Sequence, residues 1–172
     1  QNARPAGSLT ANWMKVRTIG LVDCLEAVVA ASGWSERRGK LPRGRGLGIA
    51  SSAYMCGAGL PIYFNDMPHS GVQLLLDRGG GVTVACGAAE VGQGSDTVLA
   101  TLVAEVLGLG LDDVKLVTGD TALGPVDLGS YSSRVTLMMG NAALEAAGRA
   151  RERLAAAAAQ KLEVPVERIG FG

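Results

Sequence analysis

One continuous stretch, residues 82–107, restricts the fold most strongly because it runs from a strand through a glycine-rich turn into a helix. Val82 to Ala85 is predicted to be a strand, the returning strand of a hairpin. After Gly94, apolar residues recur at i, i+1, i+4 and i+5, which predicts a helix that buries one face. Gly108 suits the left-handed position just past its end. The apolar stripe consists of Val98, Leu99, Leu102, Val103, Val106 and Leu107.

The rest of the chain predicts a sheet covered by helices. A hairpin is expected where apolar runs flank Asp77 to Gly81, and Pro165 ends a long run of strong helix formers. We therefore expect an α+β fold, a mainly antiparallel sheet with the two longer helices packed on one face. The further predicted elements are a short helix from Leu21 to Ala31, strands at Val72 to Leu76 and Val114 to Val117, and a long helix from Ser133 to Leu162.

The sequence predicts two regions. Residues 1–40 are interpreted as a connector with one short helix, and residues 41–172 as part of a single domain. A basic run around the boundary favours a solvated linker, although an anion or partner site stays open. This run comprises Arg37, Arg38, Lys40, Arg43 and Arg45.

Composition excludes several function classes. Sixteen basic and sixteen acidic residues give no net charge, and only 4% of residues are aromatic, so nucleic acid is not an expected partner. Cys24, Cys56 and Cys86 form no metal-binding spacing, and His69 is the single histidine, so no metal ligand set is predicted. No apolar run is long enough to span a membrane, and we expect a cytoplasmic segment of a longer protein.

The first candidate site is the turn that enters the predicted helix. Gly92 and Gly94 expose the backbone around Gln93, and the helix N-terminus beside Ser95 favours an oxo-anion. Alternatively, the glycines only make the turn and Ser95 or Asp96 caps the helix. The glycine spacing is not that of a dinucleotide fingerprint, yet a nucleotide-binding module remains a second hypothesis.

The second candidate site precedes the long helix. Ser130, Ser132 and Ser133 offer hydroxyl groups, while Arg134 either binds a phosphate or supports its own loop. Alternatively, one serine is an ordinary N-cap and Arg134 lies on the surface. If the two loops converge, they form a site for one large anionic ligand.

The strings GAAEVGQGSDT and GSYSSRVTLMMGNAAL, residues 87–97 and 129–144, resemble the molybdenum-cofactor-binding large subunit of the xanthine dehydrogenase/oxidase family. The resemblance extends from about Leu41 to Ile169 and is greatest to the alpha subunit of 4-hydroxybenzoyl-CoA reductase. It implies part of a larger molybdopterin-binding domain, with Gln93 beside the molybdenum and Gly92 and Gly94 admitting the backbone. Ser95 belongs to the same motif, and Ser132, Ser133 and Arg134 would hold the pterin and its phosphate-bearing arm.

The resemblance also implies the chemistry. Family members transfer an oxygen atom and two electrons at an activated carbon, on an aromatic, heterocyclic or aldehyde substrate, or remove a hydroxyl from an aromatic thioester. The implied cofactor is molybdopterin with molybdenum, in the cytosine dinucleotide form, with iron–sulfur clusters and FAD on partner subunits.

Two motifs of the family are absent from these residues. One is a second glycine-rich motif, and the other carries the catalytic glutamate; Glu163 and Glu167 stand in no such motif. No catalytic residue is therefore predicted, and a non-catalytic scaffold segment is the remaining alternative.

Overall fold

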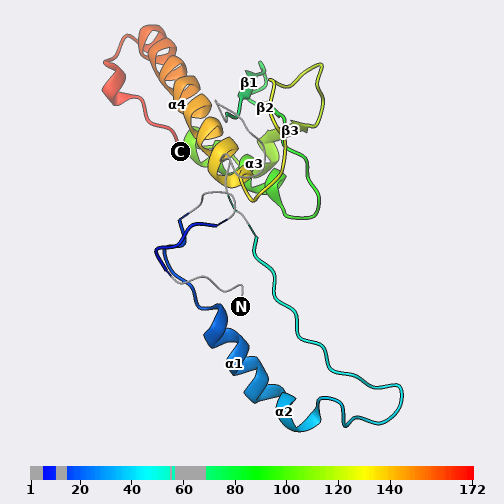
Figure 1. Cartoon of the computed structure of the whole chain (residues 1–172). Coiled ribbons are helices and arrows are strands. Elements are labelled where there is room, and N and C mark those ends of the chain that lie inside the picture. The colour runs from blue at the N-terminus through cyan, green and yellow to red at the C-terminus, as the bar shows by residue number, and fades with distance from the viewer. Residues whose placement is uncertain (1–5, 11–14, 55, 57–68) are drawn as a thin grey trace. The chain divides into compact units, whose positions relative to one another are not determined.

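The computed structural model describes residues 6–10, 15–54, 56 and 69–172. The chain divides into two units, Gln1–Tyr54 and Met55–Gly172 (Figure 1). The boundary expected after residue 40 stays a prediction, and the part of the family resemblance that falls on residues 57–68 lies outside the described residues.

The described residues of the first unit form two helices, α1 (Leu21–Ser32) and α2 (Trp34–Arg37). Gly33 separates them with a left-handed φ of 61°, a conformation that glycine adopts without steric cost. The predicted short helix is thus confirmed and ends one residue later than expected. Neither helix buries a residue, and the basic side chains of residues 37–45 are exposed, as expected of a solvated linker.

The second unit is built on a three-stranded sheet, β1 (Val72–Leu76), β2 (Val82–Cys86) and β3 (Val114–Thr118), in that order. β1 and β2 form the predicted antiparallel hairpin. Asp77 shapes its turn, because one carboxylate oxygen accepts the N–H groups of Gly79 at 2.7 Å and Gly81 at 3.0 Å.

The sheet is mixed, which corrects the expectation of a mainly antiparallel one. β3 lies parallel to β2, with Val82 opposite Val114 and Cys86 opposite Thr118. A parallel neighbour needs a crossover connection, and helix α3 (Ser95–Leu107) supplies it between the two strands. The α+β class itself is confirmed.

Both longer helices pack on the sheet, as predicted (Figure 1). α4 spans Val135–Leu162 and lies against α3 and β1. Small residues allow the close contact, since Ala143 and Ala147 are fully buried and a Cβ on Gly140 would lie 3.3 Å from Leu102. The core combines one sheet face with both helices: Val82, Val84, Cys86, Leu99, Val103, Leu107, Met139, Ala143 and Ala147.

α4 begins two residues later than expected because Ser132 and Ser133 have positive φ values of 51° and 55°, which a right-handed helix does not allow. Two short 3₁₀ turns complete the unit, η1 (Leu111–Asp113) and η2 (Val166–Arg168). Within the described part of the chain, no helix has the length and apolar character that crossing a membrane requires.

Candidate functional site

The two predicted loops meet at one edge of the sheet. Because β2 and β3 are parallel, their carboxyl ends at Cys86 and Thr118 point the same way, and this edge is where ligands bind in open α/β sheets. The N–H of Ala89 in the first loop donates to Oγ of Ser130 in the second at 2.9 Å. Residues 87–94 and 119–134 therefore lie side by side, as the sequence predicts.

Gly87 shows how closely the loops approach. A Cβ added there would lie 2.4 Å from Cβ of Asp127, a separation that real side chains do not reach. Only glycine fits at this position, because any side chain would push the second loop away from the end of β2.

Gln93 stands on an open turn. Gly92 and Gly94 have φ values of 99° and 77°, and a Cβ on either would meet nothing within 4 Å. The Gln93 side chain is turned back into the loop, accepting from Val91 N–H at 2.7 Å and donating to Ala89 O at 2.9 Å and Ser95 Oγ at 2.7 Å. No described residue accepts the backbone N–H of Gln93, which remains open to a ligand.

Glu90 organises the same turn. Its Oε1 accepts the N–H groups of Gly92 at 2.8 Å and Gly94 at 3.0 Å, and its Oε2 accepts Asp96 N–H at 3.1 Å and Ser95 Oγ–H at 3.3 Å. These bonds, the one from Gly94 foremost, lower the pKa of Glu90 to about 2. The expected cap of α3 by Ser95 or Asp96 is wrong, because neither side chain bonds the helix end and Glu90 does so from the loop.

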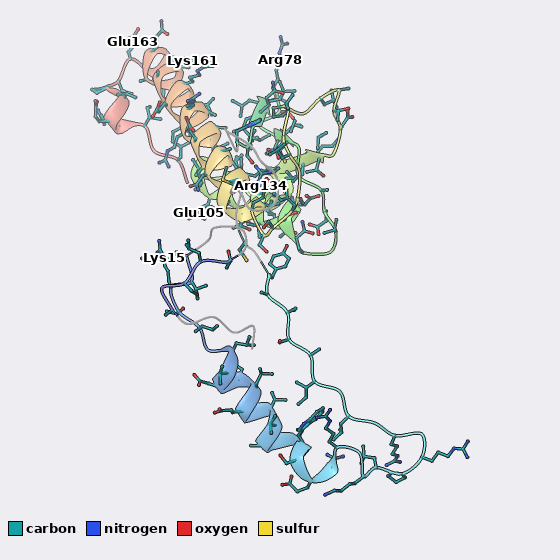
Figure 2. The ribbon with its side chains drawn as sticks, viewed as in Figure 1. Lys15, Arg78, Glu105, Arg134, Lys161 and Glu163 are labelled. Carbon is teal, nitrogen blue, oxygen red and sulfur yellow. The ribbon has the colours of Figure 1, made fainter. Side chains whose placement is uncertain are left out.

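Arg134 supports the second loop from inside. Its guanidinium is fully buried against Asp127, with Nη1 2.9 Å from Oδ1, and also donates to the carbonyl of Gly129. The other amino group bonds Ser70 Oγ at 2.8 Å and the carbonyl of His69. Arg134 thus ties the chain before β1 to the start of α4 (Figure 2), and the alternative that it lies on the surface is wrong.

The serines of the second loop differ in access. Ser132 is buried, whereas Ser133 is exposed beside it. α4 has no side-chain cap hydrogen bond, so the alternative of an ordinary serine N-cap is wrong. Of the predicted site residues, Gln93 and Ser133 are exposed, and the Gln93 side chain bonds back to its own loop. Ser95, Ser132 and Arg134 are buried.

Acidic groups surround the edge of the sheet. A pocket of about 200 Å³ opens between the loops, lined by Gly87, Gly119, Asp120, Thr121, Gly124, Pro125, Val126 and Asp127. Burial, and secondarily the charge of Glu90, raises the pKa of Asp96, whose Oδ1 is buried without a hydrogen-bond partner. Burial also raises the pKa of the Cys86 thiol.

Sequence reasoning missed the groups that hold the loops. The acid within the first motif was a signal for Glu90, since an anion near a helix N-terminus is stabilising. The position of Asp127, seven residues before Arg134, was a weaker sequence signal for their ion pair. Nothing in the sequence pattern indicated that His69 or Ser70 would bond Arg134. Among the described residues, no group of three or more His, Cys, Asp or Glu side chains is placed to hold a metal ion.

Two polar, glycine-opened loops joined at the carboxyl ends of parallel strands define a cofactor-binding segment. Over residues 25–172 the chain matches the family described as "Molybdopterin cofactor-binding domain", and it belongs to that family.

Two relatives support this assignment. The chain is 32% identical over 154 residues to the xanthine dehydrogenase molybdenum-binding subunit of Escherichia coli O157:H7, covering 86% of this chain and 20% of that subunit. It is 39% identical over 141 residues to subunit gamma of the 6-hydroxypseudooxynicotine dehydrogenase complex of Paenarthrobacter nicotinovorans, covering 80% of this chain and 17% of that one.

A solved structure gives the same result. Quinoline 2-oxidoreductase from Pseudomonas putida 86 aligns with a TM-score of 0.61 and 26% identity, over 96% of this chain and 22% of that chain. The present chain spans about a fifth of the length of such relatives.

Proposed function

We propose that this chain forms part of the molybdopterin site in the large subunit of a molybdenum-dependent oxidoreductase. The observation that carries the proposal is the junction of the two family motifs, where Ala89 and Ser130 are hydrogen-bonded across loops distant in sequence. Membership of the family, the two relatives and the solved structure support the chemical class.

The loops fit a large, polar cofactor. A ligand can approach the backbone at Gly92 and Gly94 because both face open space, and the N–H of Gln93 is available as a donor. The exposed hydroxyl of Ser133 is the matching group on the second loop. The buried carboxylate oxygen of Asp96 has no internal partner, and an N–H donor of a pterin would satisfy it.

Each residue then has a defined task. The backbone N–H of Gln93 and the hydroxyl of Ser133 contact the cofactor, Gly92 and Gly94 admit it, and Ser95 holds the Gln93 amide. Ser132 and Arg134 keep the second loop in shape from below. When bound, the cofactor supplies oxygen-atom and two-electron transfer, while this chain binds and orients it.

The finer features follow the family resemblance. We propose the cytosine dinucleotide form of the cofactor, iron–sulfur and FAD subunits as partners, and a cytoplasmic location. The substrate is proposed to be a small aromatic, heterocyclic or aldehyde compound, or an aromatic thioester of the 4-hydroxybenzoyl-CoA reductase type. The name of one relative, a subunit of the 6-hydroxypseudooxynicotine dehydrogenase complex, supports a multi-subunit assembly.

Metal analysis of the native protein tests the proposal. Near-stoichiometric molybdenum is expected in the wild type. The double variant Gln93→Ala/Ser133→Ala should lose most of it, because the first loop loses the three hydrogen bonds of the Gln93 amide and the second loop loses its hydroxyl. A matched pair, Gln160→Ala/Ser35→Ala, changes exposed residues of the same types outside the loops and should retain molybdenum. Full molybdenum content and activity in the loop variant would contradict the proposal.

A further inference from the structure

The N-terminus of α3 is already filled by an acidic side chain of its own loop. An open helix N-terminus offers free N–H groups and a partial positive charge to an anion. Here the Glu90 carboxylate takes that position, with both oxygens bonded to donors from Gly92, Gly94, Ser95 and Asp96 at 2.8–3.3 Å. The low pKa of Glu90 keeps this group charged throughout the physiological range.

An internal anion changes what the site can accept. A phosphate brought to this end of α3 would meet a carboxylate in its place and a second one at Asp96, which lies in the first turn of the helix. Glu90 already accepts the N–H groups that a phosphate would need, and like charges at hydrogen-bond distance repel one another. The end of α3 is therefore closed to the phosphate that the glycine pattern alone would suggest.

The same carboxylate fixes the turn around Gln93. Its Oε1 binds the N–H groups on both sides of Gln93, at Gly92 and Gly94. Its Oε2 accepts from Ser95 Oγ, and that hydroxyl accepts the Gln93 amide at 2.7 Å. Backbone and side chain of Gln93 are thus both held through Glu90.

We propose that Glu90 is a built-in anion that occupies the phosphate position at the N-terminus of α3 and serves as the positioning residue for Gln93. The part concerning Gln93 rests on the proposed cofactor site, and the part concerning the helix end does not. The loop accordingly offers the cofactor the neutral backbone N–H of Gln93, and the phosphate of the cofactor is bound elsewhere.

Chemical rescue tests the helix-end position directly. In the native protein stripped of cofactor, Glu90→Ala should raise hydrogen–deuterium exchange of residues 90–96 about tenfold, because the turn loses its anion. Added formate should restore protection in a saturable way, and chloride at equal ionic strength should not. The control Glu105→Ala removes an exposed acid in the last turn of α3 (Figure 2), away from the loop, and should respond to neither salt.

Two results would overturn the proposed place of the Glu90 carboxylate at the end of α3. One is unchanged hydrogen–deuterium exchange in Glu90→Ala, and the other is no difference between formate and chloride. Inorganic phosphate supplies a further check, since it should protect residues 90–96 in Glu90→Ala and leave the wild type unchanged. Phosphate protection of the wild type would show that the helix end is open.

The role toward Gln93 needs a spectroscopic measurement on the loaded enzyme. The Mo(V) electron paramagnetic resonance signal of Glu90→Gln should shift in the same direction as that of Gln93→Ala, and formate should return Glu90→Ala to the wild-type signal. An unshifted signal in a fully loaded Glu90→Gln protein would refute the positioning role. Absence of molybdenum from the wild type would instead refute the proposed function, leaving the rescue result valid.

Discussion

Asp127 and Arg134 form an ion pair whose two side chains have no exposed surface. Asp127 also accepts N–H groups from Gly129 at 2.8 Å and Gly71 at 3.3 Å, so one carboxylate organises three segments of chain. Burying two charges is costly, and removal of one partner leaves the other uncompensated. The pair is therefore a means of fixing the second loop.

Replacement of Asp127 by Asn should lower the free energy of unfolding by about 3 kcal/mol, because the Arg134 charge would remain buried without its partner. Urea denaturation of the native protein measures this change. The surface pair of Arg149 and Glu145, exposed by 72% and 65%, gives the matched control. Glu145→Gln should cost about 0.5 kcal/mol or less, and an equal effect of the two substitutions would contradict the assignment.

Lowering the pH should loosen the first loop, because Glu90 becomes protonated. A carboxyl group whose pKa falls from 4.5 to about 2 on folding stabilises the fold above pH 4.5, and this contribution disappears as the pH falls towards 2. Hydrogen exchange of residues 90–96, corrected for its intrinsic pH dependence, should therefore differ most between wild type and Glu90→Gln above about pH 5. A difference of the same size at pH 2.5 and pH 7 would be inconsistent with this cause.

The types of residue that form the site could be predicted from the sequence more easily than the contacts between those residues. The glycine and serine motifs correctly indicated two loops that meet, because backbone conformation near glycine is a local property. The burial and the partners of a charged side chain depend on which distant segments of the chain pack against it. Arg134 is buried by residues 69–70 and Asp127, and its partners could not be found from local sequence.

At the level of elements, the α3–α4 contact depends on small side chains. Ala143 is fully buried there, so a larger residue would separate the helices. We expect Ala143→Leu to lower the free energy of unfolding by about 2 kcal/mol through overpacking. The exposed Ala156 on the same helix provides the control, since Ala156→Leu should change stability by less than about 0.5 kcal/mol.

Thermal or urea unfolding measures the stability of Ala143→Leu and Ala156→Leu. Equal stability of the two variants would show that α3 and α4 are not packed at Ala143. The many alanines of residues 133–162 leave room for this close packing. The hairpin and the α3 stripe were equally predictable, because each depends on residues near in sequence. The parallel pairing of β2 with β3 was not, because either strand direction buries the same alternating residues.

For the whole molecule, cofactor removal should affect the two loops and spare the core. Residues 87–96 and 128–134 lie at the exposed edge of the sheet, whereas Leu99, Val103 and Met139 have no exposed surface. Loss of a ligand that binds only the folded loops removes its stabilisation from them. Hydrogen exchange should thus rise in the loops of cofactor-free protein and stay unchanged in residues 99–107 and 139–147.

An equal rise in hydrogen exchange in the loops and in residues 99–107 and 139–147 would contradict a local binding site. Equal exchange in loaded and cofactor-free protein would place the cofactor away from these loops.

The crossover through α3 has a consequence for the order of folding. β1 and β2 are joined by a short turn and pair as soon as both have left the ribosome, whereas β3 pairs with β2 only after residues 87–113 have emerged. The face of the sheet that α4 covers stays uncovered until residues 135–162 follow. During synthesis, the nascent chain therefore exposes Val82 and Val84 to the solvent, which makes this interval the period in which a chaperone is most useful.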